Sequence, residues 1–312
     1  MMRRLFALLL CAVLLTGCAP EEKEPEKADR YTFTDDTGAQ VQVPYQPQTV
    51  AVLTSSLADM WCVAGGTVDI TVGETVERGF AAGDVILVDQ GAGKTILLEQ
   101  LVAAQPDLVL YSSDLAGQAA CVDSLKAAGI PAAGFSVETV EDYLRLLKIC
   151  TDILRNPQAY ETHGVALKAR VDGLIAAAQA QPEQPKILFV RSGSSAKYTK
   201  AKNAQNHFVC VMLQQLGTHN IADSAPILLD GLSMEEILLQ DPDMILFTTM
   251  GDESAGTAYM ESLVEDPVWQ QLSAVKNGKV FQLPKALFQY KPNARWDEAY
   301  AYLIQLLYGD IL

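Results

Sequence analysis

LEQLVAAQPDLVLY at residues 98–111 and MEEILLQDPDMILF at residues 234–247 follow one pattern at a constant offset along the chain. In each copy a helical pattern ends at a Pro-Asp pair, and an apolar strand follows directly. Proline stops the helix, and the aspartate can hold the turn into the strand. Two α/β units can resemble each other by chance, but a repeat at this distance indicates two related lobes.

Short apolar segments alternate with helical patterns around the first copy. The segment 50–53 is apolar throughout and stops at Thr54-Ser55-Ser56, which is typical of a strand buried on both faces. Further strands are predicted at 69–73, 85–88, 107–111 and 130–133, and helices at 57–64, 97–105 and 119–128. Such alternation predicts an α/β fold with a parallel sheet and helices on both of its faces.

Two helical patterns then follow without a strand between them, at 140–154 and from Pro157 to about residue 180. Alternation resumes with the apolar segment 186–190, where a second α/β lobe begins. We therefore expect an N-terminal lobe at 31–155, a stiff connecting helix at 156–182 and a C-terminal lobe at 183–312.

The first residues have the parts of a secretory signal peptide, 1–17: two arginines, an apolar run at 5–15 and small residues before Cys18. A membrane-spanning helix needs about 20 apolar residues, more than this run contains. Leu15-Thr16-Gly17-Cys18 resembles the bacterial lipobox, which implies that Cys18 is lipidated and anchors the protein at the bacterial cell surface or in the periplasm. The charged segment 18–30 is expected to be a disordered tether.

The chain of 312 residues has a formal net charge of −15. Removing residues 1–17 deletes two arginines and no acids, so the mature part is more acidic still. A chain this acidic is a poor candidate for nucleic-acid binding, and we expect no nucleic-acid partner. The four remaining cysteines are Cys62, Cys121, Cys150 and Cys210. They lie in apolar or helical stretches without CxxC spacing, so free thiols are expected, although an exported protein can also form a disulfide.

Two further segments complete a family pattern: LGTHNIAD at 216–223 and WQQLSAVKNGKV at 269–280. With the repeat and the lipobox, they resemble the helical-backbone (class III) substrate-binding proteins of ABC transporters, which serve iron–siderophore, haem and cobalamin importers. The resemblance covers about residues 31–312. It implies two Rossmann-like lobes, a rigid connecting helix and a ligand cleft between the lobes.

The chain departs from this family at one position. In the cobalamin-binding members a glutamate that helps to dock the permease precedes the Asn-Ile pair, whereas His219 stands here. Other acids are therefore the candidates for docking: Glu74 and Glu77 in the first lobe, and Asp223 and Glu235 in the second. Surface acids are more often simply solvated.

Positive charge is segregated in the second lobe. The stretches 186–222 and 267–296 contain ten lysines and arginines and no acid. In an acidic chain this segregation indicates a basic wall that attracts an anionic ligand, although a solvated edge without acids is the alternative.

Ligands of open parallel sheets lie beyond the carboxyl ends of the strands. We therefore take as candidate ligand-binding residues those that follow predicted strands, together with those just before the last helix. Hydroxyls, cations and aromatic faces in such loops suit an oxygen-rich chelate. Hydroxyls at strand ends are also common caps, and Trp296 is as plausibly a core residue. The candidates are Ser55, Ser56, Tyr111, Ser112, Arg191, Lys197, Tyr198, Lys200, Thr248, Thr249, Tyr290, Lys291 and Arg295.

Enzymatic and metal-binding patterns are weak. The stretch 91–95, GAGKT, lacks the earlier glycine of a phosphate loop, because Val88 stands there. His163, His207 and His219 are dispersed, which does not favour a bare zinc site. No GxSxG motif occurs, so we expect neither catalysis nor a cofactor.

These patterns predict an extracytoplasmic lipoprotein, monomeric, that captures an anionic metal chelate such as an iron-siderophore, haem or corrinoid. It would deliver this ligand to an ABC permease and its ATPase. The alternatives are a surface sensor or scaffold lipoprotein that kept the fold, or a binder of another small anionic nutrient.

Overall fold

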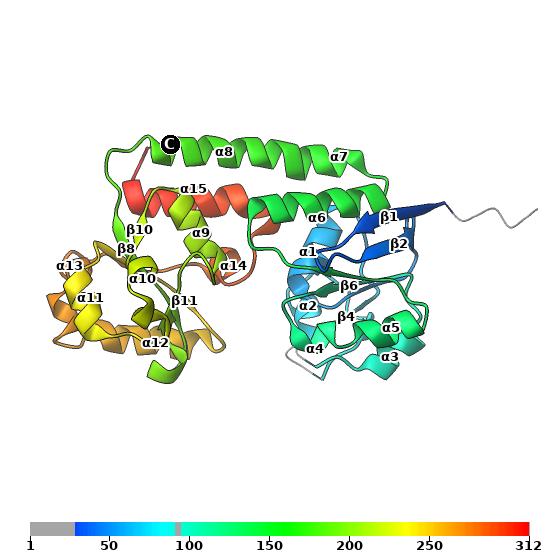
Figure 1. The fold of residues 1–312 in the computed structure, drawn as a ribbon, viewed down its shortest axis with the longest axis horizontal. Helices are drawn as coiled ribbons and strands as arrows, with labels where there is room; N and C mark the ends of the chain where they lie inside the picture. Colours follow the sequence, from blue (N-terminus) through cyan, green and yellow to red (C-terminus); the bar gives the residue numbers. More distant parts are fainter. Residues whose placement is uncertain (1–28, 91–94, 312) are drawn as a thin grey trace, which may run out of the picture.

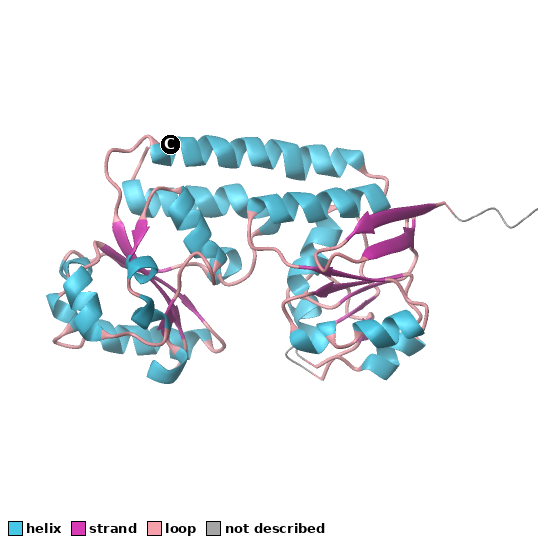
Figure 2. Cartoon of the chain, in the orientation of Figure 1, coloured by secondary structure: helices cyan, strands magenta, loops and turns pink. Residues whose placement is uncertain are grey.

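The computed structural model describes residues 29–90 and 95–311. The predicted signal peptide, Cys18 and nearly all of the predicted tether lie outside these residues, as does most of the glycine-rich stretch 91–95. Two α/β lobes lie side by side beneath a layer of long helices (Figure 1). Figure 2 shows a sheet inside each lobe with helices around it, and a separate pair of strands at the outer edge of the first lobe.

The first lobe is built on a parallel sheet with the strand order β5-β4-β3-β6-β7. Its elements are β3 (Val50–Val52), α1 (Ser55–Val63), β4 (Ile70–Thr71), α2 (Gly73–Glu77), β5 (Ile86–Leu87), α3 (Leu98–Ala103), β6 (Leu108–Ser112), α4 (Ala116–Ala119), α5 (Val122–Ala127) and β7 (Ala132–Phe135). All three residues of β3 are buried, as the apolar pattern predicts.

The second lobe repeats this plan with the parallel order β10-β8-β11-β12, to which β9 adds an antiparallel pair on β8. Its elements are β8 (Lys186–Ser192), β9 (Lys200–Ala201), α9 (Phe208–Gln215), β10 (His219–Asn220), α10 (Ile221–Ser224), α11 (Met234–Gln240), β11 (Met244–Thr249), α12 (Glu253–Val264), α13 (Ser273–Lys276), β12 (Val280–Gln282), α14 (Lys285–Phe288) and α15 (Trp296–Tyr308). The predicted α/β fold of two lobes is thus confirmed.

The repeated Pro-Asp pair has the same role in both lobes. Asp107 accepts hydrogen bonds from the backbone N–H groups of Gln48 and Thr49, at 2.9 and 3.0 Å, just before β3. Asp243 accepts one from the N–H of Lys186, at 2.8 Å, where β8 begins. Each aspartate therefore fixes the start of the neighbouring strand, whereas its own helix already ends a few residues earlier, at Ala103 in the first lobe and at Gln240 in the second.

The helical layer consists of α6 (Val140–Ile153), α7 (Pro157–Tyr160), α8 (Ala166–Gln179) and α15. A π-helical turn at Glu161–Val165 joins α7 to α8. Asn156 caps this long helix by accepting from the N–H of Ala159, with proline at the first helical position. The helix passes above both lobes, and α15 of the second lobe packs along α8.

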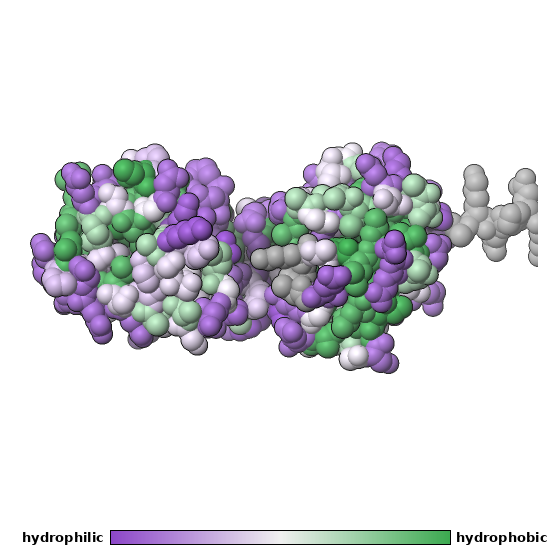
Figure 3. Space-filling model, turned by 90° about the horizontal axis from the view of Figure 1, so that it is seen from below, coloured by the Kyte–Doolittle hydropathy of each residue, from purple (hydrophilic) through white to green (hydrophobic). Residues whose placement is uncertain are grey.

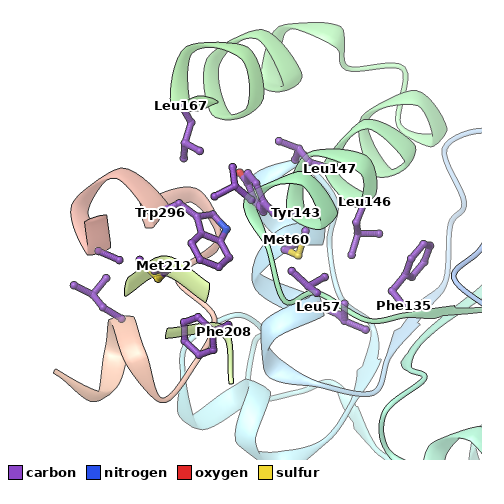
Figure 4. Close-up of a cluster of buried hydrophobic side chains, with 14 of the residues drawn as sticks. Leu57, Met60, Phe135, Tyr143, Leu146, Leu147, Leu167, Phe208, Met212 and Trp296 are labelled. Atoms are coloured by element: carbon purple, nitrogen blue, oxygen red, sulfur yellow. The ribbon is translucent and has the colours of Figure 1, made fainter. Parts of the chain in front are cut away.

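The largest apolar core runs from one lobe into the other (Figure 4). It joins residues of α1 and α6 to residues of α8, α9 and α15: Leu57, Met60, Tyr143, Leu146, Leu147, Leu167, Phe208, Met212 and Trp296. Burial of apolar surface contributes roughly 25 cal/mol per Å². A core shared in this way therefore opposes large movements of one lobe against the other.

An antiparallel hairpin precedes the first lobe and was not expected from the sequence. It pairs β1 (Arg30–Thr34) with β2 (Gln40–Pro44). Phe33, Val41 and Val43 pack into the shared core. They alternate with exposed residues, the period of two that is typical of a strand with one buried face. Its turn contains Gly38 at φ 83°.

Cys62, Cys121, Cys150 and Cys210 are free thiols, buried except for the half-buried Cys62. Among the described residues, no helix combines the length and the apolar character that a membrane span requires.

Candidate ligand-binding site

The strand order reverses once in each sheet, between β3 and β6 in the first lobe and between β8 and β11 in the second. Ligands of open α/β sheets bind beyond the carboxyl ends of the strands at such a switch point. Two cavities lie there, and both are lined by Lys291. From below, the lobes appear as two bodies that meet at a narrow waist (Figure 3).

We define the crossover segment as residues 289–293, which connect α14 to the turn before α15 and contact α1 of the first lobe. Asn293 is fully buried and donates from Nδ2 to the carbonyl of Ser56 at 3.0 Å and to Oδ2 of Asp59 at 2.8 Å. Its φ of 51° lies in the left-handed region, which asparagine tolerates better than most residues. These hydrogen bonds fasten the segment, which belongs to the chain of the second lobe, to α1 of the first lobe, with Lys291 in its centre.

The second-lobe cavity has a volume of about 190 Å³ and brings residues of both lobes together. Its lining residues are Glu138, Arg191, Asn206, His207, Phe208, Gln289 and Lys291. Glu138 is the only acid among them, opposite an arginine and a lysine. The cavity therefore presents mainly hydrogen-bond donors and positive charge.

Arg191 reaches this cavity from the end of β8, where it pairs with Thr248 of β11 and Lys200 of β9. Burial lowers the pKa of its guanidinium, although arginine stays protonated at any physiological pH. Its Nε atom is buried and has no hydrogen-bond partner within the described residues. A buried donor of this kind is costly without an acceptor, and an anionic group in the cavity would supply one.

His207 lies beside these cations. Its Nδ1 accepts a hydrogen bond from the N–H of Val209 at 3.3 Å and caps α9, so the ring proton is assigned to Nε2. Burial, and then the charges of Lys291, Arg191 and Lys202, lower the pKa of His207 to about 3. The imidazole is therefore neutral near pH 7 and offers a hydrogen bond without a charge.

Lys291 completes the group. Its Nζ lies 2.6 Å from Oε1 of Glu138 and 4.5 Å from the centre of the Phe208 ring. Burial lowers the pKa of this ammonium group, and Glu138 opposes that shift. Lys202 lies near these cations as well. Burial lowers the pKa of its ammonium group, and the charges of Arg191 and Lys200 lower it further. Arg191, Lys200, Lys202 and Lys291 thus lie near one another in an acidic protein. Attraction of an anionic ligand by this basic wall stays a prediction.

The first-lobe cavity, of about 180 Å³, is more apolar. Ser56 and Ser112, two of the predicted residues, line it with Lys291 and Asn293. The remaining lining residues are Thr54, Leu57, Met60, Asp114, Leu115, Phe135 and Val137. A ligand that reached both cavities would meet hydroxyls and apolar side chains on one side and cations on the other.

Other predicted residues lie outside the two cavities. Ser55 is buried; its Oγ donates to Glu74 at 2.8 Å and accepts from Arg78 at 2.7 Å. Tyr111 is a core residue whose ring lies over Gly134, where a Cβ atom would approach it within 2.5 Å. Both side chains are therefore committed to the interior of the first lobe.

In the second lobe, Thr248 and Thr249 are buried at the end of β11. The guanidinium of Arg78 covers the Tyr290 ring at 3.9 Å. Arg295 forms two hydrogen bonds with Glu298, at 2.7 and 2.6 Å, within its own helical turn. Lys197, Tyr198 and Lys200 are likewise not among the lining residues: Lys197 lies on the exposed Tyr198 ring, and Lys200 is in β9.

Five residues of the second-lobe cavity were not expected from the sequence: Glu138, Asn206, His207, Phe208 and Gln289. His207 and Gln289 lie in the acid-free stretches that predict the basic wall. Membership of these stretches was the one sequence pattern that could have indicated them as site residues. Glu138 precedes a helix of the first lobe and gives no such signal. No group of three or more His, Cys, Asp or Glu side chains suited to a metal ion occurs among the described residues.

The candidate docking acids differ in their surroundings. Glu77 in α2, Asp223 in α10 and Glu235 in α11 are exposed. Glu74 is half-buried and accepts the hydrogen bond from Ser55. Three of the four are therefore accessible to a partner.

A family described as periplasmic binding protein matches residues 50–287. No curated protein matches the chain. Among solved structures, a periplasmic solute-binding protein from Veillonella parvula is 22% identical, with a TM-score of 0.69 over 91% of this chain and 88% of that one.

Two further similar structures are of proteins named for the ligand that they bind. The catecholate-siderophore binding protein VctP from Vibrio cholerae is 16% identical, with a TM-score of 0.70 over 88% of this chain and 98% of that one. The haem-binding protein RhuT from Roseiflexus is 17% identical, with a TM-score of 0.68 over 85% and 99%. Likeness at this identity concerns the fold.

Proposed function

Since the chain belongs to the periplasmic binding protein family, we propose that it captures an anionic metal chelate outside the cytoplasm and delivers it to an ABC importer. The ligand class is a ferric siderophore or a similar chelate, including haem or a corrinoid. The protein itself carries out no catalysis, because ATP hydrolysis belongs to the ATPase of the importer. Similar structures that bind a catecholate siderophore or haem support this class of ligand.

The observation that carries the proposal is the group of Arg191, His207 and Lys291 around one cavity between the lobes. Charge-assisted hydrogen bonds to carboxylate, catecholate or hydroxamate oxygens would hold the ligand there. The described residues include no set of side chains suited to a bare ion, so we infer that the metal arrives with its own ligands. Capture would need only a slight closure, since the lobes share an apolar core.

Delivery requires a partner in the membrane. We propose that Cys18 carries the lipid anchor and that the protein acts as a monomer near the permease. The exposed acids Glu77, Asp223 and Glu235 are candidates for docking on basic permease residues. Replacing each by lysine should abolish uptake in cells and leave ligand affinity unchanged. If ligand affinity fell instead, these acids would belong to the binding site.

Tryptophan fluorescence of the purified protein tests ligand binding. Trp296 is fully buried, and its ring centroid lies 5.9 Å from that of Phe208, which in turn contacts Lys291. Titration with ferric siderophores, haem, cobalamin and small anions should give a Kd below about 10 μM for a metal chelate. Binding of a simple nutrient but of no chelate would contradict the proposal.

A further inference from the structure

The ion pair between Glu138 and Lys291 occupies the place where an anionic ligand would bind. Nζ of Lys291 and Oε1 of Glu138 are 2.6 Å apart, and both side chains line the second-lobe cavity. A carboxylate of the protein itself thus contacts the cation on which the proposed function depends. We propose that Glu138 is a specificity-determining residue: its carboxylate fills the anion position of the ligand-free protein, and a ligand must displace it.

The backbone around Glu138 is fixed, whereas its carboxylate can move away. The N–H of Glu138 donates to Oδ2 of Asp142 at 3.2 Å, and Thr139 and Asp142 form a capping box at the start of α6. About half of the Glu138 side chain is exposed, against 23% for Lys291. The carboxylate can therefore rotate into solvent while Lys291 stays against Phe208.

The surroundings of Lys291 favour exchange of its partner. Arg191 retains a buried Nε without an acceptor, and Oε1 of Gln289 is buried without a donor, both on the wall of the same cavity. Glu138 therefore satisfies Lys291 and leaves other groups of the site unsatisfied. A ligand with several anionic or polar oxygens would satisfy more of them than one carboxylate does.

The selection that follows depends on charge. A neutral ligand cannot replace the carboxylate without leaving Lys291 unpaired, which is costly in a partly buried site. A ligand that presents a carboxylate or a comparably charged oxygen can do so. The inference rests on the proposed function and narrows its ligand to chelates that bear such a group.

The test is the variant Glu138→Gln, which keeps the size of the side chain and removes its charge. The matched control is Glu141→Gln, the same change three residues along the chain, where the acid is 62% exposed and lies 3.8 Å from Lys168. Ferric citrate, a ferric catecholate and haem serve as probes, with cobalamin as a probe whose charge is small. Glu138→Gln should bind its best anionic chelate at least five-fold more tightly than wild type does, and Glu141→Gln should stay within two-fold.

A second readout needs no ligand. The pKa of Lys291, followed by NMR of ¹³C-methylated lysines and assigned with Lys291→Gln, should be lower in Glu138→Gln than in wild type, because an opposing acid is lost. An unchanged pKa would show that the pair is absent in solution and would overturn the inference.

The binding results separate the inference from the proposed function. Equal or weaker binding by Glu138→Gln, with wild type binding well, would overturn the inference alone and make Glu138 a positioning residue for Lys291. No binding of any chelate by either protein would contradict the proposed function and, with it, the role of Glu138.

Discussion

Asn293 donates a hydrogen bond from Nδ2 to Oδ2 of Asp59, 2.8 Å away, and so fastens the crossover segment to the first lobe. Burial raises the pKa of the Asp59 carboxyl, and the hydrogen bond from Asn293 opposes that shift. The two residues are far apart in the sequence but hold Lys291 at the waist between the lobes.

Asn293→Ala should therefore destabilise the protein. It leaves Asp59 without this donor, at about 1–3 kcal/mol, and places alanine at a left-handed φ, at about 1–2 kcal/mol. Urea unfolding should show a loss of about 2–5 kcal/mol. Asn293→Gly separates the two costs, since glycine removes only the hydrogen bonds. A stability of Asn293→Ala equal to wild type would contradict this role.

The repeated aspartates should differ in their contributions. Asp107 accepts two backbone hydrogen bonds and Asp243 one, so Asp107→Ala leaves more N–H groups unpaired. We expect a loss of about 2–3 kcal/mol for Asp107→Ala and about 1–2 kcal/mol for Asp243→Ala, measured by urea unfolding. The Asp→Asn variants keep an acceptor oxygen and should lose less. The reverse order of the two alanine variants would argue against strand fixation by these side chains.

His207 should make stability depend on pH. Its pKa falls from 6.5 to about 3 on folding, so below pH 6.5 the unfolded state takes up a proton that the folded state does not. The contribution is present above pH 6.5 and is lost as the pH falls towards 3, by up to about 1.4 kcal/mol per pH unit.

His207→Asn removes the titrating group and keeps a side chain that can cap α9. The difference in unfolding free energy between wild type and variant should be constant above pH 7. Between pH 6 and 4, wild type should lose unfolding free energy relative to the variant. Parallel stability curves over that range would mean that the imidazole is protonated in the folded protein as well.

Much of the fold was predictable because parallel α/β units leave a strong local signal. Short apolar runs, such as 50–53 before Thr54-Ser55-Ser56, marked the central strands, and the Pro-Asp repeat marked both lobes. The hairpin was missed because Phe33, Val41 and Val43 form a short alternating pattern whose partner surface, the shared core, is distant in sequence. The π-helical turn at Glu161–Val165 likewise leaves the helical pattern continuous.

The site was predictable in part. Strand ends and the acid-free stretches pointed to Arg191 and Lys291, which the fold brings to one cavity. Tyr111 also ends a strand, yet Gly134 on the neighbouring strand makes room for its ring inside the lobe. Whether such a side chain faces the cleft depends on the pleat and on its neighbours. Glu138 could not be found, because its role depends on a lysine that only the fold places beside it.

The account depends most on the cations of the second-lobe cavity. The direct measurement is isothermal titration of wild type, Arg191→Gln and Lys291→Gln with the ferric chelate that wild type binds most tightly, with Lys279→Gln, an exposed lysine of the same lobe, as the control. A lost charge-assisted hydrogen bond of about 1.5–3 kcal/mol predicts at least ten-fold weaker binding for each cavity variant and less than two-fold for the control. Wild-type affinity in both cavity variants would contradict the account.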